Sequence, residues 1–279
     1  MTVFAHAKAL VDAEWLARHL EDPNLRLVEL DVSAKAYDDG HLPGAVLWNV
    51  YRDLKDCDYR LVDRATLERL IARSGIRRDS TVIFYGYAPA LGFWLMKLYG
   101  HSDVRVLDCS RDAWQAEGRP WSTATSEPRV GGYHLDDEDL HIRANCEAVQ
   151  DAIGRPGTLI LDVRSGAEYE GERFWPSGGL QPDGRAGHVP SAVHKPIDGL
   201  YDRRGAFRDA ADLRSLFSSV DLDRADDLIT YCTIGGRAAT AWFVLTYLLG
   251  REHVRVYDGS WAEWGRLTDV PVATGRERI

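Results

Sequence analysis

The feature that most constrains the fold is an internal duplication, because three segments of the first half recur in the same order in the second half. With 279 residues, the chain is long enough for two domains of ordinary size, each with its own core. We therefore expect two domains that share one fold. The recurring segments are Leu-Asp-Val at 30–32 and 161–163, Gly-His-x-Pro-x-Ala-Val at 40–46 and 187–193, and Val-Arg-Val-x-Asp at 104–108 and 254–258.

Each copy alternates segments of strand character with segments of helical character. Such alternation predicts a parallel sheet covered by helices on both faces, and hence an α/β fold in each half. The strand-like runs are 25–31, 81–85, 159–163 and 228–231, and the helical patterns include 65–74 and 210–220. Residues 121–139 are rich in Ser, Thr, Gly and acidic residues, as is typical of a connection. The predicted domains are residues 1–125 and 141–279, joined by a linker at 126–140.

The two copies differ in length at two places. Asp162 lies 131 residues after Asp31, whereas Gly187 lies 147 residues after Gly40, so the second copy holds 16 extra residues between these points. It gains four more residues, which we expect immediately after the run at 228–231. Because loops on a rigid scaffold commonly carry function, the second copy is predicted to hold the active site.

A cysteine occurs beside the second enlargement. Cys232 follows the run at 228–231, and Gly86 stands at the equivalent place in the first copy. Taken alone, Cys232 would be interpreted as a core residue, because cysteine is among the most buried residue types. The coincidence of a cysteine with an enlarged loop in one copy favours a catalytic nucleophile. The residues that follow it are Thr233, Ile234, Gly235, Gly236 and Arg237.

This segment has the composition of an anion-binding loop. The end of a parallel strand, before a helix, is where open α/β sheets bind ligands. Gly235 and Gly236 allow successive N–H groups to point inward, and the N-terminus of the next helix adds positive potential. Arg237 either adds a full charge or braces the loop. We expect this environment to favour the thiolate of Cys232, which is the reactive form of the side chain.

These motifs resemble the rhodanese superfamily, and specifically the tandem-domain thiosulfate and 3-mercaptopyruvate sulfurtransferases. The resemblance covers nearly the whole chain and rests on the duplicated turns, the Tyr-Cys-Thr-Ile-Gly-Gly-Arg loop and the Asp-Gly-Ser-Trp segment at 258–261. It implies two tandem rhodanese-like domains, of which the N-terminal is inactive and the C-terminal catalytic. It also implies that Cys232 takes sulfur from a small anionic donor as a persulfide and passes it to cyanide or a thiol, without a metal or organic cofactor.

The resemblance further implies an arginine that meets the anionic donor shortly before the second Gly-His turn. Arg185 is at the matching position, and Arg173, in the same inserted stretch, is the alternative. With them we count the loop residues 233–237 as candidate substrate-binding residues. Phe174 and Trp175 are predicted either to wall the entrance of the active site or to pack against the other domain.

Other functions stay open as alternatives. Four residues separate Cys232 from Arg237, whereas related phosphatases use a Cys-x5-Arg loop, so a phosphatase or arsenate reductase is disfavoured. The loop matches neither the Cys-Gly-Ser-Gly-Val of mercaptopyruvate enzymes nor the Cys-Arg-Lys-Gly-Val of mitochondrial-type thiosulfate enzymes. Arg237, and the lack of an evident carboxylate clamp, favour thiosulfate as donor over 3-mercaptopyruvate. A non-catalytic persulfide carrier or regulatory module is the alternative outside the enzymes.

Composition limits the binding partners and the cellular compartment that we expect for this protein. A net charge of −9 argues against broad binding to nucleic acid or to an anionic membrane. No apolar run is long enough to cross a bilayer, and the N-terminus lacks the pattern of a signal peptide, so a cytoplasmic protein is expected. The four cysteines include no Cys-x-x-Cys pair, which argues against a zinc site and a disulfide scaffold. We expect a monomer with a cleft between its domains.

Overall fold

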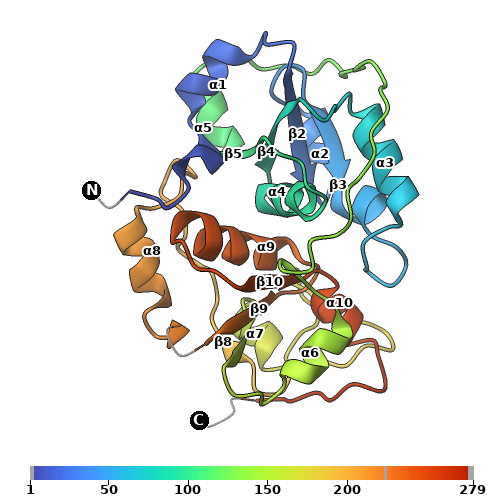
Figure 1. Cartoon of the computed structure of the whole chain (residues 1–279), viewed down its shortest axis with the longest axis vertical. Coiled ribbons are helices and arrows are strands. Elements are labelled where there is room, and N and C mark those ends of the chain that lie inside the picture. The colour runs from blue at the N-terminus through green and yellow to red at the C-terminus, as the bar shows by residue number, and fades with distance from the viewer. Residues whose placement is uncertain (1–2, 223–224, 276–279) are drawn as a thin grey trace.

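The computed structural model, which describes residues 3–222 and 225–275, consists of two similar α/β units (Figure 1). Each unit has a five-stranded sheet in which the strands pair in parallel. The strand order is β1-β5-β4-β2-β3 in the N-terminal unit and β6-β10-β9-β7-β8 in the C-terminal unit, so the two sheets share one topology. The predicted α/β class with two tandem domains is confirmed. The proposed boundaries at 125 and 141 stay a prediction.

The elements follow in chain order within each unit. The N-terminal unit contains β1 (Leu10–Val11), α1 (Ala13–His19), β2 (Leu25–Asp31), α2 (Lys35–Asp38), β3 (Val46–Asn49), α3 (Arg64–Arg73), β4 (Thr81–Gly86), α4 (Pro89–Leu98), β5 (Val104–Leu107) and α5 (Arg111–Ala116). The C-terminal unit contains β6 (Arg143–Ala144), α6 (Cys146–Ala152), β7 (Thr158–Asp162), α7 (Gly166–Tyr169), β8 (Val193–His194), α8 (Ala210–Phe217), β9 (Asp227–Tyr231), α9 (Gly236–Phe243), β10 (Val254–Tyr257) and α10 (Ser260–Trp264).

Strand β4, at the centre of the N-terminal sheet, is a nearly continuous apolar run because helices cover it on both faces. In β4, the consecutive residues 82–85 are at most 1% exposed. Helices begin where the sequence supplies a cap: the Asp63 carboxylate accepts a hydrogen bond from the backbone N–H of Thr66 at the start of α3, and Asn145 does the same for Ala148 in α6. Within residues 3–222 and 225–275, none of the helices combines the length and apolar character needed to span a membrane.

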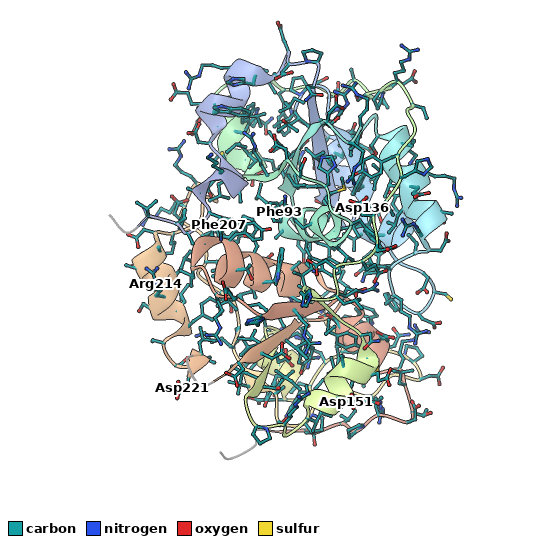
Figure 2. All side chains as sticks on the ribbon, in the orientation of Figure 1. Phe93, Asp136, Asp151, Phe207, Arg214 and Asp221 are labelled. Carbon is teal, nitrogen blue, oxygen red and sulfur yellow. The ribbon has the colours of Figure 1, made fainter. Side chains whose placement is uncertain are left out.

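Helices α4 and α9 pack against each other and join the two units (Figure 1). The ring of Phe93 in α4 meets Phe243 in α9 edge-on, with centroids 4.9 Å apart, and meets Tyr247 at 4.7 Å. Phe207 lies beside Phe243 at 5.6 Å, so aromatic rings from both units share this boundary (Figure 2). Since these side chains belong to one buried cluster, the core is continuous from one unit to the other.

The structure corrects one expectation about the duplicated copies. Tyr231 ends its strand 146 positions after Tyr85, and α9 begins at Gly236, 147 positions after the start of α4 at Pro89. Only one of the four extra residues therefore precedes the helix. Helix α9 and the π-helix that continues it, Val244–Leu248, hold 8 and 5 residues, against 10 in α4. The expectation that all four residues enlarge the cysteine loop is wrong, because three of them lengthen the helix through its π-helical end.

Candidate active site

Cys232 lies between the carboxyl end of β9 and the N-terminus of α9, as the sequence predicts. Its side chain is buried, and the Gly235 N–H donates a hydrogen bond of 3.2 Å to Sγ. The backbone N–H of Cys232 donates to Ser260 Oγ at 3.1 Å. The sulfur therefore lies beside a backbone N–H donor at the N-terminus of a helix.

The loop needs glycine at position 235. Gly235 has a φ of +94°, which residues with a side chain rarely adopt, and a Cβ there would lie 2.8 Å from the carbonyl oxygen of Asp258. The start of α10 fastens the loop from the other side. The backbone N–H groups of Trp261 and Ala262 donate to the carbonyls of Cys232 (3.0 Å) and Thr233 (2.8 Å). The conformation around Sγ is therefore fixed by main-chain contacts.

Arg237 braces this loop through a buried carboxylate on α7. Its Nη1 and Nη2 donate to the two carboxylate oxygens of Glu168 at 2.9 and 2.7 Å, in the bidentate geometry that arginine forms with carboxylates. Thr233 Oγ1 accepts from Arg237 at 2.7 Å and donates to Glu168 at 2.6 Å. Of the two roles that the sequence left open for Arg237, the geometry supplies bracing.

Both members of this pair stay charged. Burial alone would raise the pKa of Glu168, but the hydrogen bonds and charge of Arg237 outweigh it and lower that pKa to about 2. Burial opposes the charge of Arg237 as well, yet its hydrogen bonds to Glu168 raise its pKa above the ordinary value. Arg237 is therefore a paired cation at the edge of the site.

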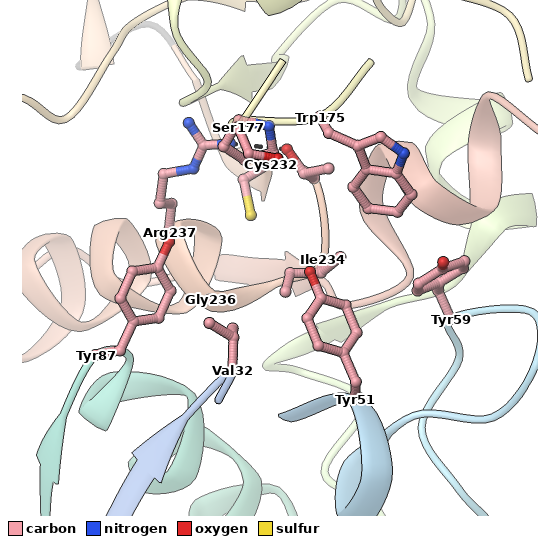
Figure 3. A pocket seen from close by; sticks show the side chains of 12 residues that line it. Val32, Tyr51, Tyr59, Tyr87, Trp175, Ser177, Cys232, Ile234, Gly236 and Arg237 are labelled. Atoms are coloured by element: carbon pink, nitrogen blue, oxygen red, sulfur yellow. Dashed lines mark hydrogen bonds between the residues drawn. The ribbon is translucent and has the colours of Figure 1, made fainter. Parts of the chain in front are cut away.

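A cavity of about 320 Å³ opens beside Cys232, and both units line it. Figure 3 shows the Cys232 sulfur pointing toward the side that Tyr51 and Tyr87 form. The lining residues from the C-terminal unit are Trp175, Pro176, Ser177, Cys232, Thr233, Ile234, Gly236 and Arg237, and those from the N-terminal unit are Val32, Tyr51, Tyr59 and Tyr87. The N-terminal unit, which has no counterpart of Cys232, thus supplies part of the cavity lining.

Tyr51 and Tyr87 are neutral hydroxyl groups at physiological pH. Burial raises the pKa of Tyr51, with smaller contributions from neighbouring groups. Burial also raises the pKa of Tyr87, an effect that the nearby charge of Arg237 opposes. Each can therefore donate a hydrogen bond to an anionic group held in the cavity.

A lysine of the N-terminal unit reaches beneath the cysteine loop. Lys55 is buried, and its Nζ donates at 2.7 Å to the carbonyl of Asp258, the same oxygen that a Cβ on Gly235 would meet. Nζ also lies 3.6 Å from Asp258 Oδ2, and Arg143 donates to Oδ1 at 2.8 Å. Burial lowers the pKa of Lys55, an effect that Asp258 opposes. The contact couples the support of the loop to the position of the N-terminal unit.

The two arginines of the insertion lie away from the cavity. The guanidinium of Arg185 donates to the carbonyl of Val270 at 2.8 Å and to that of Leu267, and it ties the insertion to the C-terminal segment. Arg173 donates to Ser165 Oγ at 3.2 Å, at the cap of α7. Neither borders the cavity as the described residues shape it. A substrate contact by Arg185 or Arg173 stays a prediction.

Several lining and supporting residues were not identified from the sequence. Tyr51, Tyr87, Glu168 and Lys55 reach the site only through the packing of distant segments. Tyr59 carried a signal, because the equivalent position of the second copy, 146 residues later, is a glycine. Across the described residues, no three His, Cys, Asp or Glu side chains gather closely enough to hold a metal ion.

Comparison with known proteins identifies the family. The rhodanese-like domain family matches residues 12–117 and again residues 145–267. The chain belongs to the rhodanese sulfurtransferase family. The resemblance predicted from the loop and the duplicated turns is confirmed, since both rhodanese-like domains fall where the sequence repeats.

Curated rhodanese relatives match this chain along nearly its whole length. The sulfur carrier protein TtuD of Thermus thermophilus is 39% identical, over 98% of this chain and 99% of TtuD. A thiosulfate sulfurtransferase of Corynebacterium glutamicum is 40% identical, over 98% of this chain and 92% of that protein. Among solved structures, EanB has a similar fold, with a TM-score of 0.86 over 99% of this chain and 72% of EanB, at 21% identity.

Proposed function

We propose that this chain is a thiosulfate sulfurtransferase in which Cys232 carries the sulfur as a persulfide. The observation that carries the proposal is the position of Sγ, which accepts a hydrogen bond from the Gly235 N–H at the N-terminus of α9 and borders the cavity. The Corynebacterium glutamicum relative, named a thiosulfate sulfurtransferase, supports the choice of donor.

The first half-reaction loads the cysteine. The Cys232 thiolate attacks the outer sulfur of thiosulfate and forms a new S–S bond to Sγ. The bond between the two sulfurs of thiosulfate breaks, and its electron pair leaves with sulfite. The product is a Cys232 persulfide whose terminal sulfur carries the negative charge. We assign the binding of the anionic donor to the loop residues Thr233, Ile234, Gly235 and Gly236, and to Arg237, which borders the cavity while it stays paired with Glu168.

The second half-reaction unloads it. Cyanide or a thiolate attacks the terminal sulfur, the S–S bond to Sγ breaks, and its electron pair returns to Sγ as the thiolate. The product is thiocyanate or a new persulfide, and the enzyme is ready for another donor. Because the donor's product leaves before the acceptor reacts, the kinetics should be ping-pong.

A carrier role is the second candidate, and one observation favours it. The 39% identical relative TtuD is named a sulfur carrier protein. A carrier would form the same Cys232 persulfide but release it to one dedicated acceptor and not to cyanide. Turnover with cyanide distinguishes the two candidates.

The test is thiocyanate production from thiosulfate and cyanide by wild type and by Cys232→Ala. The proposal predicts turnover by wild type that is lost in the variant. Folding of the variant is checked by circular dichroism, because the substitution is at a buried position. Absence of turnover by folded wild type would reject thiosulfate as donor, and 3-mercaptopyruvate would then be assayed in its place.

A further inference from the structure

The two units contain the same tight turn, at residues 56–60 and at residues 202–206. An isolated antiparallel bridge flanks each turn, and the aspartate that begins it accepts backbone hydrogen bonds from the residues two and four positions later. The fourth residue of each turn is left-handed, with a φ of +74° at Gly205 and +62° at Tyr59. Tyr59 thus occupies a place for which the second copy uses glycine.

A tyrosine in this conformation indicates an external constraint. Left-handed φ is unfavourable for bulky residues and persists only where the surroundings hold it, most often at functional sites. Two contacts to the C-terminal unit hold this turn on either side of Tyr59. Arg60 Nε lies 2.5 Å from Glu263 Oε1, and Arg266 Nη1 donates to the carbonyl of Cys57 at 2.9 Å.

The turn carries the Tyr59 ring into the cavity beside Cys232 (Figure 3). Its centroid lies 5.4 Å from Trp175 and 6.4 Å from Tyr51. Trp175 is itself held in place, by an edge contact with Phe174 at 5.0 Å and by a 3.0 Å hydrogen bond from its Nε1 to Gln181. Tyr51, Tyr59 and Trp175 form an aromatic wall that is fixed before any ligand binds.

We propose that this aromatic wall is the binding subsite for the sulfur acceptor, and that the acceptor is a thiol with a flat aromatic body. The proposal rests on the sulfur transfer proposed for Cys232. A cavity of about 320 Å³ has the size of small-molecule sites and far exceeds what cyanide fills. Among the described residues that line it, none is acidic, and Arg237 is the charged side chain. Fixed aromatic rings favour an aromatic ligand.

The chemistry requires only the two reactants. The thiol loses its proton to water, and its thiolate attacks the terminal sulfur of the Cys232 persulfide. A new S–S bond forms on the acceptor, the S–S bond to Sγ breaks, and its electron pair returns to Sγ. The aromatic body, packed on the wall, would hold the attacking sulfur next to the persulfide.

The test measures discharge of the persulfide in a single turnover. The enzyme is loaded with thiosulfate, freed of excess donor and mixed with phenylmethanethiol or methanethiol, and loss of the added sulfur is followed by intact-protein mass spectrometry. Both probes are alkyl thiols, but phenylmethanethiol is the stronger acid, so each rate is divided by the concentration of the thiolate. We expect phenylmethanethiol to discharge the wild-type persulfide roughly tenfold faster at equal thiolate concentration. Equal rates for the two thiols would overturn the proposal.

Two variants of Tyr59 provide the matched comparison. Tyr59→Gly introduces the residue that the second copy has at this place, so the turn should form without loss of thermal stability. The ratio of the discharge rates with phenylmethanethiol and with methanethiol should fall toward one. Tyr59→Phe keeps the ring and should keep the preference. A preference that survives in Tyr59→Gly would overturn the role of the wall.

Failure of the proposed function is distinguishable from failure of this inference. If thiosulfate does not load Cys232, that is seen before any acceptor is added. The persulfide can then be installed with inorganic polysulfide, and the comparison of the two thiols proceeds unchanged.

Discussion

At the scale of single residues, the proposed activity depends on the hydrogen-bond donors and charged side chains that surround the Cys232 sulfur. Cys232 is reactive only as a thiolate, and the nearest donor to it is the N–H of Gly235. The position of that N–H depends on the conformation of the loop. Hydrogen bonds from Thr233 and Arg237 to Glu168 hold the loop in this conformation. Glu168 thus acts on the reaction through the shape of the loop, as a positioning residue.

Glu168→Gln should therefore destabilise the protein in a pH-dependent way. The substitution leaves Arg237 without its anion, and loss of one partner of a buried pair typically costs roughly 3 kcal/mol. The pKa of Glu168 falls from 4.5 to about 2 on folding, so the carboxylate stabilises the fold fully above pH 4.5 and loses this effect as the pH drops toward 2. Thermal unfolding of wild type and variant should differ most at neutral pH and converge in acid. The exposed Glu172→Gln is the control, and an equal difference at all pH values would contradict this account.

Comparison of the two copies identified the candidate nucleophile, Cys232, but not the residues that support its loop. The loop 232–237 could be identified because one copy has a cysteine where the other has a glycine. Glu168 could not, because it reaches Arg237 across 69 positions of sequence and only the packing of α7 brings them together. Arg185 was selected by position along the chain, but its hydrogen-bonding partners lie more than 80 residues away, near the C-terminus.

At the scale of elements, the strand, loop and helix around Cys232 form a unit whose geometry is set by glycine. The runs predicted as strands at 25–31, 81–85, 159–163 and 228–231 form β2, β4, β7 and β9 to within one residue at each end. The π-helical end of α9 was not predicted, since local periodicity does not distinguish it from an α-helix.

Gly235→Ala should disrupt the loop, because the new Cβ adds a steric clash to the backbone strain at a positive φ. A Cβ at this position combines a φ of +94° with a 2.8 Å approach to the Asp258 carbonyl. We expect a loss of roughly 1–3 kcal/mol in stability and of most sulfur transfer activity, because the N–H that contacts Sγ moves. Gly154→Ala is the control, since its φ is +66° and a Cβ there would meet nothing within 4 Å. Similar activity in the two variants, measured in the thiocyanate assay, would contradict the role given to this loop.

At the scale of the whole molecule, the N-terminal unit lacks a counterpart of Cys232 but contributes residues to the cavity. It contributes the tyrosines of the cavity and the buried Lys55 beneath the cysteine loop. It also shares a continuous apolar core with the C-terminal unit along α4 and α9. The duplication predicted the fold of each unit, but the contacts between them depend on substitutions that no repeat pattern reveals.

The two units should consequently unfold together. Phe93→Ala removes the ring that α4 packs on Phe243 and Tyr247, and such a truncation costs roughly 3–5 kcal/mol. We expect one lowered transition in denaturant, with tryptophan fluorescence and far-ultraviolet circular dichroism coinciding. Two separated transitions in wild type would show that the units fold independently.

The central claim is that Cys232 alone carries the sulfur, and the most direct measurement is the location of the persulfide. The protein is incubated with thiosulfate, its free thiols are alkylated, and peptides containing each of the four cysteines are weighed. The account predicts one added sulfur atom on Cys232. It predicts none on Cys109 or Cys146, because burial raises the pKa of both thiols, that of Cys146 to about 11. Sulfite release with the added sulfur on another cysteine, or on none, would contradict it.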